Sequence, residues 1–152
     1  MSELRELYQQ VILDHHRKPR NFRKLPRPTG TAEGYNPLCG DRVSVEVETD
    51  DGVIRDIAFQ GSGCAISRAS ASLMTAALKG QTMGDAEAAF DRFHRMLTDS
   101  EPSRELTEAL GKLAVFAGVR EFPSRIKCAT LPWHTARAAL AGQPEAALVS
   151  TE

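Results

Sequence analysis

The spacing of apolar positions divides the chain into a helical beginning, a short region of alternating residues and a long helical remainder. From Ser2 to about His16, apolar residues recur every three or four positions, which predicts an amphipathic helix that Ser2 can cap. Residues 17–28 are basic and contain prolines, as expected of a connecting segment. The chain therefore opens with one helix and a linker.

Between residues 29 and 60 the apolar period falls to two, which is typical of strands with one buried face. The clearest alternation is carried by Val43, Val45 and Val47. Residues 50–52, Asp-Asp-Gly, supply a hairpin turn, and residues 53–59 form the return strand, with Ile54 out of strict alternation. Residues 29–35 are a weaker candidate for a third strand.

The remainder is predicted to be helical, over residues 64–79, 83–97, 104–117 and from about 131 to 141. Thr82 with Asp85 resembles a capping box for the second of these helices. The last start is placed near Leu131 because Pro132 is tolerated only in a first turn. The predicted fold class is α+β, a small antiparallel sheet of about three strands packed against helices. We expect one domain over residues 1–145 and a flexible tail over residues 146–152.

Composition and charge exclude several classes of protein. At 152 residues the chain fits one domain, and 19 basic against 20 acidic residues leave a net charge of -1. No overall field attracts it to nucleic acid or to an anionic membrane. The longest apolar run, Leu113–Val119, is far below the ~20 residues that cross a bilayer, and the first residues are charged. We expect a soluble cytoplasmic protein.

Three cysteines stand where predicted elements begin. Cys39 lies in a turn before the first clear strand, Cys64 follows Gly61-Ser62-Gly63, and Cys128 precedes the final predicted helix. An odd number of cysteines cannot form a closed disulfide framework. One interpretation is that they are small buried apolar residues. The other is that they are ligands, because loops held by rigid elements carry function.

The surroundings of the cysteines favour a metal site. Cys64 and Cys128 are placed at helix N-termini, where the helix dipole favours a thiolate. Asp41, two residues after Cys39, can direct an oxygen to the same point. Three thiolates and one carboxylate complete a tetrahedral zinc shell, and they disfavour magnesium and calcium. The spacing matches no zinc-finger pattern, so the residues alone leave both interpretations open.

Three ordered segments resemble the signatures of the IscU/SufU/NifU-N family. They are Asn36-Pro37-Leu38-Cys39-Gly40-Asp41, Gly61-Ser62-Gly63-Cys64-Ala65-Ile66-Ser67-Arg68-Ala69-Ser70-Ala71-Ser72 and Arg125-Ile126-Lys127-Cys128-Ala129-Thr130-Leu131. With Asp14-His15-His16 and Pro19-Arg20-Asn21, the similarity extends over about residues 3 to 141. It implies an IscU/SufU-like α+β domain that takes part in building iron–sulfur clusters. At matching positions, Cys39, Asp41, Cys64 and Cys128 become the ligands of zinc or of a cluster.

The resemblance also suggests a subtype. Scaffold members carry a histidine directly before the third cysteine, whereas this chain has Lys127, and residues 101–123 resemble the insertion of SufU-type members. The SufU type implies a zinc-dependent sulfur acceptor, sulfurtransferase-like rather than a stand-alone enzyme. Its implied partners are a PLP-dependent cysteine desulfurase of the SufS type and downstream iron–sulfur scaffold proteins. The resemblance marks Cys39 as the sulfur acceptor, and Arg125 and Lys127 are expected beside the ligands, Arg125 pairing with Asp41 or a cysteine sulfur.

The same residues are also compatible with other functions. The scaffold alternative assembles a [2Fe-2S] or [4Fe-4S] cluster on the three cysteines before transfer. A cysteine hydrolase would use Cys39 or Cys128 with His134 as base, and would need no metal. A purely structural zinc module would unfold without its ion. His15, His16 and His94 are expected at the surface or half-exposed, and His134 at the surface or beside the ligands.

Overall fold

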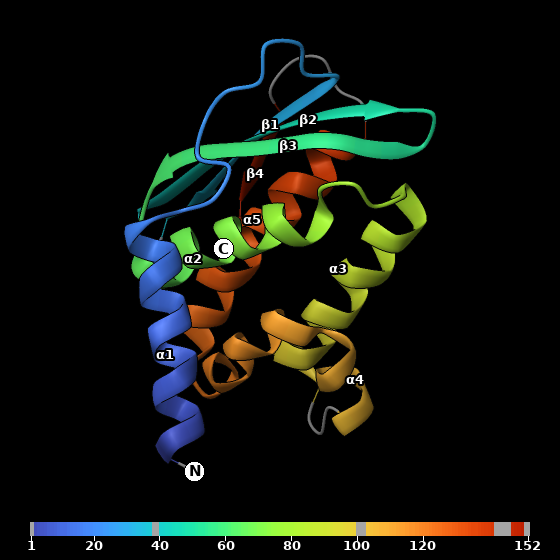
Figure 1. Cartoon of the computed structure of the whole chain (residues 1–152). Helices are drawn as coiled ribbons and strands as arrows, with labels where there is room; N and C mark the ends of the chain where they lie inside the picture. The colour runs from blue at the N-terminus through green and yellow to red at the C-terminus, as the bar shows by residue number, and fades with distance from the viewer. Residues whose placement is uncertain (1, 38–39, 100–102, 142–146, 151–152) are drawn as a thin grey trace.

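The protein is a four-stranded sheet with its helices gathered on one face, as the computed structural model shows (Figure 1). The structure describes residues 2–37, 40–99, 103–141 and 147–150. The strands are β1 (Gly30–Asn36), β2 (Asp41–Asp50), β3 (Val53–Ser62) and β4 (Ala147–Ser150). The helices are α1 (Ser2–Arg17), α2 (Ala65–Leu78), α3 (Met83–Thr98), α4 (Arg104–Ala109), the 3-10 helix η1 (Gly111–Glu121) and α5 (Pro123–Leu140). The predicted α+β class is confirmed.

The sheet has the strand order β3-β2-β1-β4, and its first three strands are antiparallel. The turn between β2 and β3 places Asp51 and Gly52 at positive φ (52° and 74°), as the two central residues of a type I′ hairpin require. A register shift between Glu48 and Thr49 accounts for the position of Ile54 out of strict alternation. The edge strand β4 pairs in parallel with β1, where the sequence predicted only a flexible tail.

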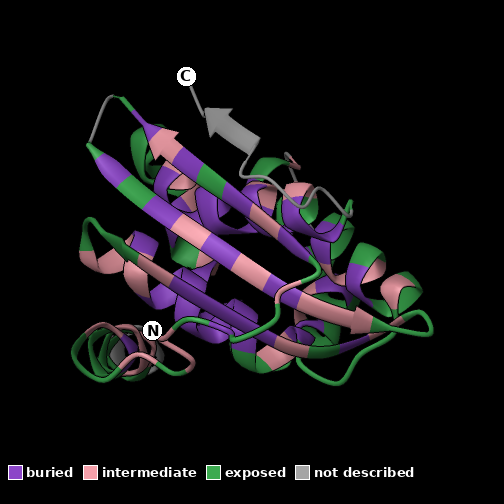
Figure 2. Ribbon diagram, turned by 90° about the horizontal axis from the view of Figure 1, so that it is seen from above, coloured by how far each residue is buried: buried purple, intermediate pink, exposed green. Residues whose placement is uncertain are grey.

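One face of the sheet contributes to the core. Buried residues alternate with half-buried ones along β2, which Figure 2 shows as alternating bands. The buried face of the sheet packs against α5 and α2, and α3 and η1 extend the core away from the sheet. There the Phe93 ring stacks on Trp133 at 4.6 Å between ring centres and meets Phe116 edge to face. The core is continuous from the sheet to the helices that carry the cysteines.

The helices confirm one capping prediction and correct two boundaries. Thr82 caps α3 and its hydroxyl accepts a hydrogen bond from the Asp85 N–H at 3.1 Å. The helix predicted over 104–117 begins where expected but its predicted end is wrong: α4 ends at Ala109, and the 3-10 helix η1 begins at Gly111 (φ 57°). The predicted start near Leu131 is also wrong, because α5 begins with Pro123 in its first turn and contains Pro132 in its interior.

Burial explains how α5 accommodates an interior proline. Pro132 removes one backbone donor from the helix, at a cost of about 3 kcal/mol. Its neighbours Leu131, Trp133 and Ala136 are all buried in the core, and apolar burial on this scale offsets the loss. Among the described residues, no helix combines the length and the apolar character needed to cross a membrane.

Candidate metal centre

Three of the four residues predicted to bind metal come together in the fold. Asp41 is the first residue of β2, Cys64 directly precedes α2, and Cys128 lies in α5. One carboxylate oxygen of Asp41 and the two Sγ atoms all lie within 4.8 Å of one another. Cys39, the fourth predicted ligand, lies outside the described residues. The sequence places it two positions before Asp41.

Asp41 is positioned by the phase of its strand. It pairs with Asn36 across the β1–β2 turn and points to the same face as the buried Val43. Its side chain is fully buried, with Oδ1 accepting a hydrogen bond from the Cys64 N–H at 2.9 Å. Its Oδ2 lies 3.7 Å from the Cys64 Sγ. The carboxylate is therefore directed toward the cysteines and away from solvent.

Cys64 lies at the N-terminus of α2, as the sequence predicted, and it caps this helix. Its Sγ accepts a hydrogen bond from the Ser67 N–H at 3.4 Å, and the residue is exposed to solvent. Its sulfur therefore lies at the N-terminal end of a helix, which carries a partial positive charge. Of the three described ligands it is the one open to an approaching molecule.

Cys128 is not at a helix N-terminus, which corrects the sequence prediction. It lies five residues after Pro123, the first residue of α5, and only 2% of its surface is exposed. Its thiol faces the Ser124 carbonyl oxygen at 3.6 Å and receives the side-chain amide of Asn36, with 3.7 Å between Nδ2 and Sγ. An amide donor from β1, rather than the end of a helix, therefore favours negative charge on this sulfur.

Asn36 is a site residue that the sequence analysis missed. It ends β1, is fully buried, and directs its amide to the Cys128 sulfur. The signal was present in the strand period, because Asn36 shares its face with Ala32 and Gly34. A polar residue in phase with buried ones at the end of a strand needs a partner, and here that partner is a proposed ligand.

Arg125 and Lys127 both lie in the first two turns of α5. Arg125 is exposed and its guanidinium lies over the Phe122 ring, 4.9 Å from the ring centre, instead of pairing with Asp41. The side chains of Phe122 and Arg125 line a surface groove of about 480 Å³ between α1, η1 and the starts of α2 and α5. Lys127 is half-buried beside Cys128. The structure thus places Arg125 at a surface groove and leaves Lys127 adjacent to a ligand.

The environment predicted for one of the histidines is wrong. His15 is buried, not at the surface, and its Nδ1 lies 2.7 Å from the Ser72 hydroxyl. Burial lowers the pKa of His15 below its ordinary value, and the Arg20 charge adds to this. His134 is half-buried and faces His94 on α3, with 6.1 Å between the ring centres.

The donor set fits a zinc-type ion. Two sulfurs and one carboxylate oxygen are softer than the all-oxygen shells that magnesium and calcium take, and they suit zinc or an iron–sulfur cluster. The buried Asn36 amide and the Cys64 N–H hold these donors from behind, as partners of metal ligands commonly do. Cys39 would supply the further sulfur of a four-coordinate site.

Comparison with known proteins identifies the family. Residues 7–129 match the family described as "NifU-like N terminal domain". The chain is 39% identical to the iron–sulfur cluster assembly scaffold protein IscU of Streptococcus pyogenes serotype M1, over 92% of this chain and 86% of that protein. It is 40% identical to the zinc-dependent sulfurtransferase SufU of Bacillus subtilis, over 87% of this chain and 88% of that protein.

Solved structures agree with this assignment. One similar structure is described as an iron–sulfur cluster assembly scaffold protein for the SUF system of Fervidobacterium islandicum. It superposes with a TM-score of 0.79 at 32% identity, covering 86% of this chain and 94% of that one. A crystal structure of a hypothetical protein reaches a TM-score of 0.82 at 39% identity, covering 90% and 98% of the two chains. The chain belongs to the IscU/SufU/NifU-N family.

Proposed function

We propose that this chain serves iron–sulfur cluster assembly as a zinc-dependent sulfur acceptor, working in the cytoplasm with a PLP-dependent cysteine desulfurase of the SufS type. The observation that carries the proposal is the convergence of Asp41, Cys64 and Cys128 within 4.8 Å. A relative with 40% identity is named as a zinc-dependent sulfurtransferase. Downstream iron–sulfur scaffold proteins would receive the sulfur.

The proposed ligands have two roles: most of them stay bound to the metal ion, and one cysteine reacts. Cys64, at the helix cap, and Cys128, held by Asn36, are fixed by hydrogen bonds from the protein and suit ligands that stay. Asp41 is a buried carboxylate, which binds zinc less tightly than a thiolate does. Bound zinc keeps thiols deprotonated at neutral pH. We assign Cys39 as the acceptor because the family resemblance marks it, and because the described residues hold the sulfurs of Cys64 and Cys128 through hydrogen bonds.

The transfer step is a thiol–disulfide type exchange. The Cys39 thiolate attacks the outer sulfur of the partner's cysteine persulfide, forming a new sulfur–sulfur bond on Cys39. The original sulfur–sulfur bond breaks and its electron pair leaves with the partner's cysteine as a thiolate. The proton on the transferred sulfur stays with it, so the products are a Cys39 persulfide and a free desulfurase thiolate. No oxidant or reductant is consumed.

Lys127 supports the acceptor over the scaffold. A histidine before Cys128 would offer a further nitrogen ligand to a cluster, whereas an ammonium group offers no lone pair. The scaffold remains the second candidate, because a relative with 39% identity is named as a scaffold. The two functions differ in whether sulfur transfer needs iron.

The test measures alanine and sulfide release by a SufS-type desulfurase in iron-free buffer. Wild-type protein is expected to stimulate turnover, and Cys39→Ser is expected to abolish stimulation while still binding the enzyme. Docking uses a broad surface, whereas transfer needs one thiolate at attack distance. Glu108→Gln, an exposed change on α4, serves as the control and should stimulate as the wild type does.

Mass spectrometry after a single turnover locates the transferred sulfur. We expect a persulfide on Cys39 and none on Cys64 or Cys128. A wild-type chain that stimulates the desulfurase only when iron is present would overturn the acceptor assignment and favour the scaffold. A chain that holds neither zinc nor a cluster would overturn both.

A further inference from the structure

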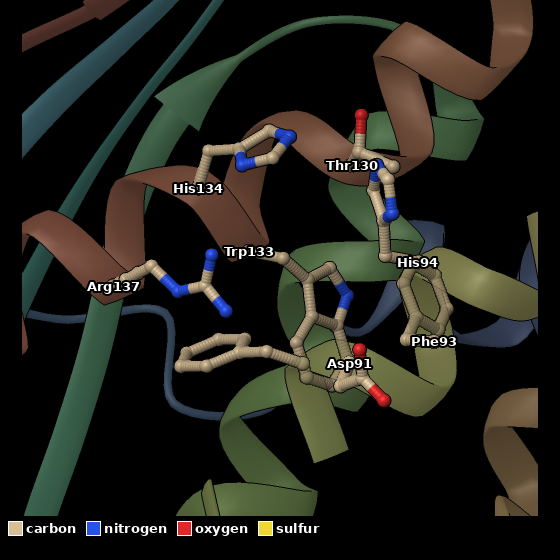
Figure 3. Close-up of a pocket in the computed structure, with 8 residues that line it drawn as sticks. Asp91, Phe93, His94, Thr130, Trp133, His134 and Arg137 are labelled. Atoms are coloured by element: carbon tan, nitrogen blue, oxygen red, sulfur yellow. The ribbon is translucent and has the colours of Figure 1, made fainter. Parts of the chain in front are cut away.

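Two histidines from different helices meet at a cavity that contains none of the proposed cysteine-site ligands. The cavity, of about 140 Å³, lies between α3 and α5 and is lined by Phe90, Asp91, Phe93, His94, Thr130, Trp133, His134 and Arg137. Figure 3 shows His94 reaching in from α3 and His134 from α5, with the Trp133 ring between the two helices. Neither imidazole has a role in the proposed sulfur transfer.

The contacts of Thr98 favour one tautomer of His94. The Thr98 hydroxyl donates its single proton to the His94 carbonyl oxygen at 2.7 Å. The same hydroxyl lies 3.4 Å from His94 Nδ1, so in that contact it can only accept. This arrangement favours the tautomer with the proton on Nδ1, which leaves the Nε2 lone pair available to a metal ion. Metal-binding histidines are commonly oriented in this way through the nitrogen that does not bind.

His134 is kept in the form that binds metals. Burial lowers its pKa below the ordinary value, and the nearby His94 and Arg137 lower it further. A neutral imidazole is the ligand form of histidine, so at neutral pH little work is needed to displace a proton. The second helix thus presents a nitrogen that is available at physiological pH.

The ring geometry is close to that of a shared ion. The two ring centres are 6.1 Å apart with an angle of 68° between the planes. Rings that each give one nitrogen to a tetrahedral zinc, at about 2.0 Å, have centres roughly 5 Å apart. Closing this difference of about 1 Å needs only side-chain rotation, because His94 is exposed and His134 is half-buried.

The local charges do not prevent a cation from binding. The Arg137 guanidinium lies over the Phe90 ring and pairs with Glu87 at 3.1 Å, so a carboxylate offsets its charge. Asp91, one turn before His94 on α3, lines the same cavity and adds a negative charge. Its ion pair with Arg95 is long, at 3.7 Å, and both side chains are exposed.

We propose that His94 and His134 form a second, exchangeable metal site that binds one borderline transition-metal dication such as Zn²⁺, Ni²⁺ or Cu²⁺. Each imidazole supplies one nitrogen and water completes the shell. Imidazole nitrogen selects these ions over Mg²⁺ and Ca²⁺, which take oxygen ligands. With two protein ligands instead of four, the site holds its ion more weakly than the cysteine centre does, so it exchanges metal readily.

The test is a Zn²⁺ titration of the full chain whose cysteine centre is already loaded with zinc. Calorimetry should show one further equivalent in the wild type, weaker than the first. His94→Gln and His134→Gln should each weaken this second binding at least about tenfold, since one of two protein ligands is lost. His16→Gln makes the same chemical change on α1 and should bind as the wild type does. Mg²⁺ should give no binding.

Two further measurements keep the result independent of the variants and of the proposed function. In the wild type, the ring-nitrogen resonances of His94 and His134 should shift on the second equivalent, and those of His16 should not. The second equivalent should persist in Cys64→Ser, in which the cysteine centre is impaired. Absence of a second equivalent in the wild type, or binding that both histidine variants leave unchanged, would overturn this site and leave the sulfur-acceptor function untouched.

Discussion

A methyl group at position 63 should disturb the metal centre without removing any ligand. Gly63 directly precedes Cys64, and a Cβ added there would lie 2.6 Å from Asp41 Oδ1 and 3.1 Å from its Cγ. Both atoms belong to one short and fully buried side chain. Because real contacts of this kind essentially never fall below 3.0 Å, Gly63→Ala must displace the carboxylate as a unit.

The size of the effect follows from what Asp41 holds. Its Oδ1 accepts the Cys64 N–H at 2.9 Å, and a hydrogen bond to a charged group contributes about 1.5–3 kcal/mol. We therefore expect the free energy of unfolding of the metal-free protein to fall by about 1.5–3 kcal/mol. Zinc affinity should fall by about 10–100-fold, as when the orientation of a ligand is lost.

The assays are urea unfolding of the metal-free chain and competition for zinc with a chromogenic chelator. Gly84→Ala is the matched control, because its added carbon comes no closer than 4.0 Å to the Thr82 hydroxyl. It lies in the first turn of α3, so it should leave zinc affinity unchanged and raise stability by up to about 1 kcal/mol. Wild-type zinc affinity and wild-type stability in Gly63→Ala would refute the assigned contact between Gly63 and Asp41.

Two further predictions concern Asn36 and His15. Asn36→Leu keeps the side-chain volume but removes the amide that faces the Cys128 sulfur, so zinc affinity should fall about tenfold or more in the same competition assay; unchanged affinity would show that the amide does not support this ligand. His15 has a lowered pKa in the folded state, so below its ordinary value of 6.5 the unfolded chain takes up a proton that the folded chain does not. The unfolding free energy should therefore fall as pH drops from about 7 to 5.5, by at most about 1.4 kcal/mol per pH unit for this residue. His15→Asn, which preserves a partner for Ser72, should flatten this slope in urea unfolding at the two pH values, and an unchanged slope would contradict the assignment.

The parts of the fold that the sequence predicted are those whose cause is local. Alternation places Val43 and its neighbours on one face of β2 without any knowledge of the rest of the chain. Asp51-Gly52 specifies its turn, and Thr82 its cap, through contacts with residues no more than three positions away. Cys64 was placed correctly for the same reason, since glycines followed by a helical pattern mark a helix start.

The parts that the sequence missed depend on distant partners. The start of α5 was misplaced because Pro132 reads locally as a first-turn residue, whereas packing of α5 against β1 and β2 decides the outcome. His15 looked exposed at the end of an amphipathic helix, but its partner Ser72 lies 57 positions further along the chain. Because the start of α5 is misplaced, the sequence also predicts the wrong environment for Cys128, although the family signature includes this cysteine.

The way in which the proposed metal centre is assembled also bears on how zinc would contribute to stability. Asp41 is brought in by a strand, Cys64 by a helix cap and Cys128 by the second turn of another helix. These three elements meet because α2 and α5 pack on the sheet, so the packing of the core brings the donors together. That core includes Phe93, Trp133 and many other buried apolar residues besides the proposed ligands. Zinc bound at the proposed centre would add stability by binding the folded state, to an extent that rises with its concentration, instead of nucleating the fold as in a structural zinc module. A site that the fold supports in this way can exchange one ligand during a reaction without loss of the domain, which is what an acceptor cysteine requires.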